Sequence, residues 1–222
     1  MNFSVITDNL YFLSTGLWTT VHLTVFTLIG GLLLGTPLAL ARASGHRVLR
    51  LPALLLIETI RGIPVLMLIF WIYFLLPHLV GAVPAYTAGL VALIVFNTAY
   101  SAEIVRAGIN SIDHGNVEAG RATGLNLVQI LRHIVLPQAF ANMTPALMSQ
   151  AVMVYKTTSV VFVIGIVDLF RAATIVNNRE FKPIEIFAFV ALVYFIPCTI
   201  VSRYTRRIEI KRMIRHGTFQ KA

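Results

Sequence analysis

Charged side chains occur inside stretches of the sequence that are otherwise apolar. Glu58 and Arg61 are three residues apart, as are Glu103 and Arg106, so on a helix each pair would place opposite charges side by side. An ionisable group near the centre of a membrane helix costs about 2.5–3.5 kcal/mol, so it is expected to be paired or to face water. We therefore predict that both pairs are structural ion pairs near the ends of membrane spans.

Lys156 is different, because no acidic residue lies within four positions of it. Two interpretations are open: its long side chain reaches the headgroup region, or it faces a transport path and meets a substrate carboxylate, with Thr158 offering a hydroxyl. Asn97 and Tyr100 are three positions apart, and Glu103 is one step further along the same side. Such groups either line a path or hold helices together by hydrogen bonds.

The composition indicates that a bilayer surrounds these side chains. Of the 222 residues, 57% are hydrophobic and 12% are charged, and the mean hydropathy is +0.80. A chain this apolar has too little polar surface to cover itself in water. The net charge of +9 does not indicate a nucleic-acid partner, because the cations lie between and after the apolar runs, which is the pattern of membrane topology.

The apolar runs predict an all-α integral membrane protein, with one domain over residues 1–222 and five transmembrane helices. Each run has about the 20 residues that a helix needs to cross the hydrocarbon core. The predicted spans are 17–41, 53–76, 86–108, 139–167 and 185–204. Alternate connecting segments carry thirteen Lys and Arg residues against three, and the three lie in the predicted outer loop 168–182. This asymmetry predicts an outside N-terminus and a cytoplasmic C-terminus.

The segment 116–137 between the third and fourth spans is too polar to cross the membrane. Asn116 is predicted to cap a helix and Glu118 to lie in its first turn, where a negative charge favours the helix dipole. Gly120 and Gly124 are four positions apart and would leave a shallow notch for another protein's side chains. Periodicity alone fits an amphipathic helix on the bilayer equally well.

The residues of this segment resemble the EAA loop of ABC-importer permeases. Glu118-Ala119-Gly120 is followed after three residues by Gly124, and later by Ile134–Pro137, with Gly120 where the pattern usually has alanine. In that family the loop forms a coupling helix seated in a cleft of the ATP-hydrolysing subunit. The resemblance implies that Glu118, Ala119, Gly120 and Gly124 dock the ATPase.

Further stretches resemble the permeases for histidine, arginine, glutamine, glutamate and opines. They are Glu58-x-x-Arg-Gly-x-Pro64, Tyr100-x-Ala-Glu-Ile-x-Arg106 and the run that starts at Lys156, while residues 168–174 are similar to glutamate/aspartate members. The resemblance implies the type I importer fold and a path for a polar amino acid, and it favours the path interpretation of Asn97 and Tyr100. It also implies a bacterial-type cytoplasmic (inner) membrane.

The partners that the resemblance implies are an ABC ATPase dimer, a second permease subunit that is a copy or a paralogue, and an extracytoplasmic amino-acid-binding protein. No Gly-Lys pair occurs, so no phosphate-binding loop can form. The chain is therefore expected not to be an enzyme and to hold no cofactor, with ATP and Mg on the ATPase. The histidines lack metal-ligand spacing, which predicts no metal site. Two other classes remain: a membrane scaffold that anchors an ATPase, and a stand-alone carrier with Glu58, Glu103 or Lys156 as a proton relay.

Overall fold

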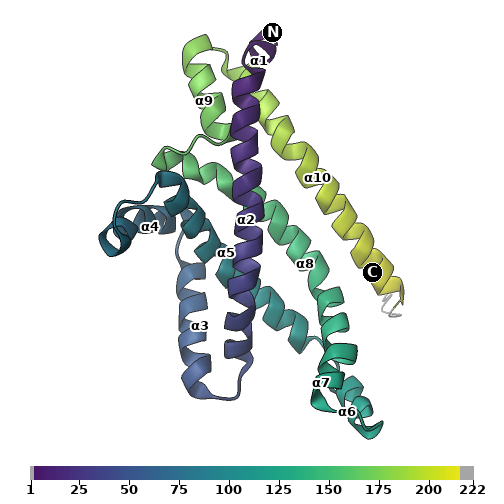
Figure 1. Cartoon of the computed structure of the whole chain (residues 1–222). Coiled ribbons are helices and arrows are strands. Elements are labelled where there is room, and N and C mark those ends of the chain that lie inside the picture. The colour runs from purple at the N-terminus through teal and green to yellow at the C-terminus, as the bar shows by residue number, and fades with distance from the viewer. Residues whose placement is uncertain (1–2, 216–222) are drawn as a thin grey trace.

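The chain is helical along the part that the structure describes. The computed structural model describes residues 3–215, with side chains up to residue 210, and this range forms helices without a strand (Figure 1). The α-helices are α1 (Ser4–Asp8), α2 (Leu10–Ala43), α3 (Arg47–Gly62), α4 (Val65–Val80), α5 (Ala85–Asn110), α6 (His114–Ala122), α7 (Leu127–Ile130), α8 (Leu136–Thr157), α9 (Leu169–Glu180) and α10 (Pro183–Arg215). A π-helical turn, Leu131–Val135, joins α7 to α8, and a 3-10 helix, Thr158–Ile164, follows α8. Lys221, the last cation of the predicted cytoplasmic tail, lies outside the described residues.

Four helical stretches are long and apolar enough to cross a membrane: Leu10–Ala43, Ala85–Asn110, Leu127–Ile164 and Pro183–Ile210. The predicted second span, 53–76, is not one helix, because α3 and α4 meet at an angle of 109°. The cause is Pro64, which disfavours a helical conformation at Ile63, and Ile63 is extended with φ −96° and ψ 134°. Four spans are present, or five if this bent pair counts as one.

The most extensive helix contact joins α2 to α5, which cross in Figure 1. A Cβ at Gly31 would overlap the side-chain amide of Asn97, and a Cβ at Gly35 would lie 2.8 Å from Cβ of Ser101. Small residues therefore let the two backbones approach, as in other membrane helix pairs. This contact fixes the side of α5 that carries Asn97 against α2.

The prediction of an outer loop over residues 168–182 is wrong, because most of this segment forms the helix α9 (Leu169–Glu180). Asp168 caps this helix by accepting hydrogen bonds from the backbone N–H groups of Phe170 (3.3 Å) and Arg171 (2.9 Å). The hydroxyl of Thr20 on α2 accepts a further bond from the N–H of Leu169 (3.1 Å). The residues that α9 buries are Leu169, Ala172, Ala173 and Val176. The segment was predicted to be a loop because it lies between two predicted spans, while its small apolar residues form a packed helical face.

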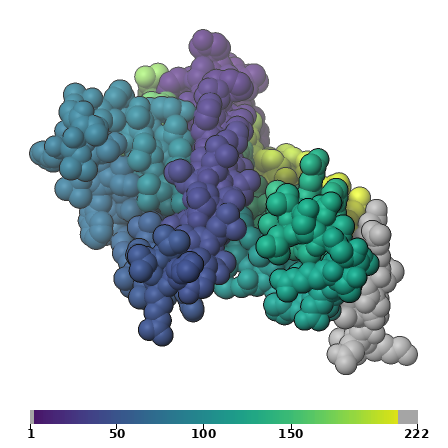
Figure 2. All heavy atoms as spheres, turned by 60° about the horizontal axis from the view of Figure 1, so that its bottom comes forward, coloured from purple at the N-terminus to yellow at the C-terminus, as the bar shows by residue number. Residues whose placement is uncertain are grey.

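The two ends of the helix bundle differ. α1 and α9 lie at the upper end in Figure 1, while the α2–α3 connection, α6, α7 and the C-terminal part of α10 lie toward the lower end. Figure 2 brings this lower end forward and shows that the lobe containing α6 and α7 projects from the rest of the chain. Segment 116–137 therefore lies where a partner below the bundle can reach it.

Candidate functional site

Segment 116–137 folds as two short helices, α6 and α7, followed by the π-helical turn. α6 begins after Asp113, whose carboxylate accepts a hydrogen bond from the N–H of Gly115 (3.0 Å). The predicted cap, Asn116, is wrong: it lies inside α6, and its side-chain amide donates to Oε1 of Gln138 on α8 (3.1 Å). Asp113 and Asn116 are both good capping types, so sequence alone did not distinguish them.

Gly124 turns the chain after α6. It has a positive φ of 81°, and α6 has already ended at Ala122. The N–H of Gly124 bonds to the carbonyl of Arg121 (3.0 Å), and the N–H of Leu125 bonds to the carbonyl of Gly120 (3.1 Å). This is the Schellman pattern, in which glycine is preferred because it adopts a positive φ without a Cβ clash. The two glycines therefore do not lie on one helical face, as the sequence had suggested.

Gly120 faces the interior of the segment. A Cβ there would lie 2.6 Å from Cδ1 of Ile134 and 3.3 Å from Cγ1 of Ile130. The expected notch is thus filled by this chain's own side chains, and Gly120 is buried. The physical role that the structure gives Gly120 is to let α6 pack against α7 and the π-helical turn.

The outer side of the segment exposes apolar side chains. Leu127, Val128 and Leu131 are 65%, 72% and 51% exposed, and Glu118 and Ala119 on α6 are exposed as well. Leu131 is four positions after Leu127 and three after Val128, so it neighbours both on the helix surface and the three apolar residues form a group. We call these five residues the coupling surface. A cluster of exposed apolar residues marks contact with a partner or a membrane.

The predicted ion pairs meet in one cluster where α2, α3 and α5 come together. Arg106 donates to Oε1 of Glu103 through two nitrogens, and Nη1 of Arg61 lies 3.9 Å from Oε1 of Glu58. Arg42, at the end of α2, donates to Glu103, and its Nη2 lies 3.2 Å from Oε1 of Glu58. Each glutamate is therefore shared by two arginines, which ties three helices together at this end. We call these five residues the arginine cluster.

Tyr100 belongs to the surroundings of the arginine cluster. The guanidinium carbon of Arg61 lies 5.6 Å from the centre of the Tyr100 ring, within the range of a cation–π contact. Glu103, also predicted to line a path, borders a cavity of about 260 Å³ between α5 and α8. These two residues lie further along α5 than Asn97, toward its end, and Glu103 also contacts α2 through Arg42.

Asn97 is fully buried between three helices. Its Nδ2 donates to the carbonyl of Thr27 on α2 (3.0 Å), and its Oδ1 accepts from Nε2 of Gln150 on α8 (2.6 Å). Thr158 is also fully buried, and its hydroxyl donates to the carbonyl of Tyr155 (2.8 Å). The structure thus favours a helix-holding role for Asn97, whereas the hydroxyl of Thr158 bonds to the turn just before it, and neither side chain is open to a path in this conformation.

Lys156 is exposed and makes no ion pair within the described part of the chain. It borders two hollows between α8 and α10, of about 370 and 350 Å³. Arg203 and Arg206 of α10 border the larger one, and Ser159 borders the smaller one. Of the residues predicted to face a path, Lys156 is the one whose charge is exposed and unpaired.

Residues 31–214 match a protein family described as the binding-protein-dependent transport system inner membrane component. The chain belongs to this family. The predicted family is thereby confirmed, together with the prediction that the chain is a membrane permease subunit.

Relatives of this permease align over nearly its whole length. The glutamate/aspartate import permease protein GltK of Escherichia coli O6:H1 is 34% identical over 88% of this chain and 91% of its own. The probable glutamine ABC transporter permease protein GlnM of Bacillus subtilis is 34% identical, and the match covers 94% of this chain and 99% of GlnM. The arginine transport system permease protein ArtQ of the same species is 32% identical, and the match covers 95% of this chain and 97% of ArtQ.

Solved structures agree with the fold of this permease. A crystal structure of an amino acid ABC transporter with histidines has a TM-score of 0.86 and 33% identity, covering 95% of this chain and 99% of the other. An inward-facing MetNI methionine ABC transporter has a TM-score of 0.72 and 20% identity, and the match covers 90% of this chain and 98% of the other. This likeness shows the same fold. The predicted all-helical type I importer fold is confirmed.

Two residues of the permease's polar sites were missed by sequence reasoning. Arg42 was counted as one cation of a connecting segment, and no pattern links it to Glu103, which is 61 positions away. Gln150 lies inside the predicted fourth span. An amide within a membrane span was a usable indication, because such groups hydrogen-bond between helices.

Proposed function

We propose that this permease forms part of a translocation path for a polar amino acid and is driven by a separate ATPase that docks on the coupling surface. The observation that carries the proposal is the exposure of Leu127 and Val128 on a segment with the EAA spacing. Its relatives are named as permeases for glutamate/aspartate, glutamine and arginine, so acidic, amide and basic amino acids are the first substrates to test.

The orientation we propose places the coupling surface in the cytoplasm. The support is the charge asymmetry of thirteen Lys and Arg residues against three in alternate connecting segments. In Figure 1, the C-terminal ends of α2 and α5, which carry Arg42 and Arg106, lie toward the same side as α6, and α9 with its cations lies at the other. The membrane would be the bacterial-type cytoplasmic membrane.

Movement of the coupling surface can pass directly to α8. Gly120 packs against Ile130 and Ile134, so α6, α7 and the π-helical turn share one small core. The side-chain hydrogen bond from Asn116 of α6 to Gln138 of α8 adds to this. Asn142 of α8 also bonds to Ser111, which ends α5 (2.8 Å). An ATPase that pulls on α6 when its dimer closes would therefore move α8, which carries Lys156 at its far end.

The assembly that fits this role has two ATPase subunits with ATP and Mg, a second permease subunit that is a copy or a paralogue, and an extracytoplasmic binding protein. ATP hydrolysis is assigned to the partner, since no phosphate-binding loop is encoded in this sequence. The binding protein would deliver the amino acid to the end that carries α9.

Docking is tested by adding bulk to the coupling surface. Ala119→Trp enlarges an exposed residue of α6 without touching the Gly120 core, and Ala188→Trp on α10 is the control at another exposed alanine. We expect Ala119→Trp to reach the membrane at normal levels and to lose co-purification with the ATPase, and Ala188→Trp to keep it. Normal co-purification of Ala119→Trp would contradict docking at this surface.

Transport is tested in vesicles with the complete complex and its binding protein. We expect substrate-stimulated ATP hydrolysis together with amino-acid uptake. ATP hydrolysis without uptake would indicate a scaffold, and uptake without the ATPase would indicate a secondary carrier.

Lys156→Met in the same vesicles tests the path, because loss of the exposed cation should lower uptake at least tenfold if it meets the substrate carboxylate. Uptake near normal would leave Lys156 outside the path.

A further inference from the structure

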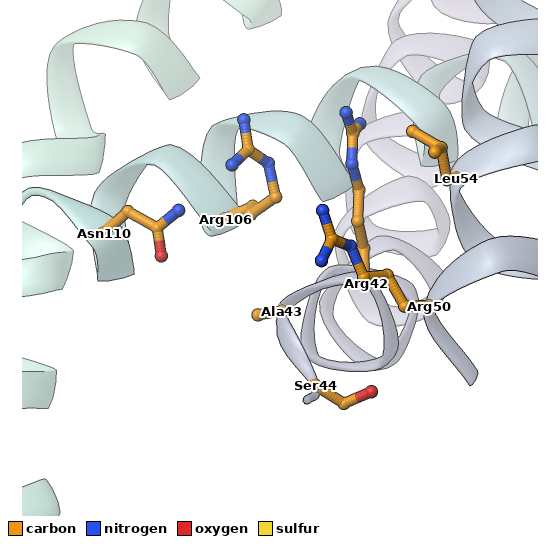
Figure 3. A pocket seen from close by; sticks show the side chains of 7 residues that line it. All are labelled: Arg42, Ala43, Ser44, Arg50, Leu54, Arg106 and Asn110. Atoms are coloured by element: carbon orange, nitrogen blue, oxygen red, sulfur yellow. The ribbon is translucent and has the colours of Figure 1, made fainter. Parts of the chain in front are cut away.

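A cavity of about 270 Å³ opens at the end of the bundle where α2, α3 and α5 meet (Figure 3). Three arginines from three helices converge on it: Arg42 from α2, Arg50 from α3 and Arg106 from α5. Ser44 and Asn110 add a hydroxyl and an amide to the lining. Every charged group that lines the cavity is a cation.

The acidic partners nearby do not neutralise these cations. The arginine cluster and Arg50 together contain four arginines and only two carboxylates, those of Glu58 and Glu103. Arg42 and Arg106 already hold Glu103, whereas Arg50 has no acidic partner among the described residues. Arg50 is also exposed, so the unbalanced charge lies at the mouth of the cavity. A group with negative charge would complete the site.

The shape of the donors indicates a phosphate. Guanidinium groups present paired N–H donors that match two oxygens of a phosphate. Arg50 has no partner among the described side chains and offers such a pair, while Arg42 and Arg106, which already donate to glutamates, add their remaining N–H groups from two other directions. The hydroxyl of Ser44 and the amide of Asn110 are uncharged donors that serve the same oxygens.

The surroundings indicate that this phosphate belongs to a lipid. Arg50 and Leu54 of α3 line the cavity, and each is followed by an exposed leucine. These leucines are Leu51, which is 52% exposed, and Leu55, which is 66% exposed. Apolar side chains beside a basic pocket at the end of membrane spans give acyl chains a surface next to the headgroup. A free phosphate ion would make no use of these leucines.

We propose that the cavity between α2, α3 and α5 binds the phosphate headgroup of an anionic phospholipid whose acyl chains lie along α3. The site is separate from the coupling surface and from Lys156. It rests on the proposed orientation, in which this end meets the cytoplasmic leaflet, where anionic lipids attract basic residues.

The test is lipid binding by the purified full chain in detergent micelles. Short-chain phosphatidylglycerol is titrated against short-chain phosphatidylcholine, and the unfolding midpoint is followed. We expect phosphatidylglycerol to stabilise the chain at lower concentration. Arg50→Gln should weaken this binding about fivefold, the effect of removing one basic residue at an anionic headgroup. Since Arg50 is exposed and unpaired, this change should not disturb folding.

Arg47→Gln is the matched control, because Arg47 is an exposed arginine one turn earlier on the same helix and does not line the cavity. We expect it to change binding less than about twofold. Equal losses in the two variants would mean diffuse attraction and would overturn the site. Ser44→Asp, which adds a carboxylate to the cavity, should block phosphatidylglycerol, and unchanged binding would also contradict the proposal.

Inorganic phosphate is titrated as the second ligand. If it stabilises the chain as well as phosphatidylglycerol does at equal concentration, the acyl chains contribute nothing and the lipid assignment is wrong. The assay contains no ATPase, binding protein or amino acid. A negative result here therefore leaves the proposed transport function untouched, and failure of transport leaves this result standing.

Discussion

Two polar clusters hold α5 to its neighbours, and they use different chemistry. Asn97 joins Thr27 and Gln150 through neutral amide and carbonyl groups, and Asn97 is fully buried. Glu103 joins Arg42 and Arg106 through full charges, and its side chain is 24% exposed. Only about 9 Å of helix axis separates positions 97 and 103 on α5. The change from amides to ions therefore occurs within two turns.

The difference follows from the cost of charge at each depth. A dry site between helices can satisfy an amide with another amide, while an ion there would have to give up its hydration. At the end of α5 the charged side chains are partly exposed, so arginines can exceed carboxylates in number. The amide cluster therefore fixes packing, whereas the arginine cluster leaves positive charge for a ligand.

The largest effect is expected for Asn97→Ala. The change leaves the amide of Gln150 without its partner in a buried site, which costs about 1–3 kcal/mol, while the carbonyl of Thr27 keeps its helical hydrogen bond within α2. We expect a loss of about 2–3 kcal/mol in the free energy of unfolding, independent of salt. Detergent-induced unfolding of the purified chain measures it.

Asn142→Ala is the matched amide control for this first prediction. Asn142 is exposed and makes one hydrogen bond, to Ser111. Its loss should cost no more than about 1 kcal/mol. Equal effects of the two changes would show that burial does not set the value of these amides, and the contrast between the clusters would fail.

Asp168 sharpens the comparison, because it is a carboxyl group in a fully buried position at the other end of the molecule. Burial raises the pKa of Asp168 to about 6, against the lowering effect of the N–H groups of Arg171 and Phe170. The folded state thus holds its proton more tightly than the unfolded state, whose pKa is near 3.8. Stability should therefore fall as pH rises from about 4 to 6, by up to about 3 kcal/mol, and stay level above.

Asp168→Asn tests this pH dependence, because asparagine keeps the capping oxygen and does not titrate. The other charged or titratable groups that act on this site are Arg171 and Tyr194, and both remain in the variant. We expect the difference in unfolding free energy between variant and parent to change between pH 4 and 7 in favour of the variant. A difference that stays constant over this range would contradict the raised pKa.

The sequence was sufficient to predict those features of the structure that depend on a local pattern of residues. Long apolar runs predicted α2, α5, α8 and α10, and the spacing of three residues predicted the contact between Glu103 and Arg106. It was insufficient where the outcome depends on which side chain lies opposite. Gly120 looked like an open notch, and Ile134 fills it, because a glycine gives no information about its neighbour.

Backbone geometry caused the remaining differences. Gly124 was placed on a helical face, but a glycine also ends helices, and only the turn at φ 81° distinguishes the two roles. Pro64 was visible in the sequence, yet the angle of 109° between α3 and α4 depends on what each helix packs against. Arg42 could not be assigned, since its partners come from two other helices.

The smallest effect is expected for Arg42→Gln in the arginine cluster. Glu103 keeps Arg106 and Glu58 keeps Arg61, so no carboxylate is left without a cation. Partly exposed ion pairs contribute about 1 kcal/mol or less, and salt screens them. We therefore expect a loss of about 1 kcal/mol at low salt that shrinks at high salt, measured by the same unfolding assay, while Arg47→Gln changes little. If Arg42→Gln costs as much as Asn97→Ala and is indifferent to salt, then the arginine cluster is a dry structural core like the amide cluster, and the lipid site would have no mobile charge to offer.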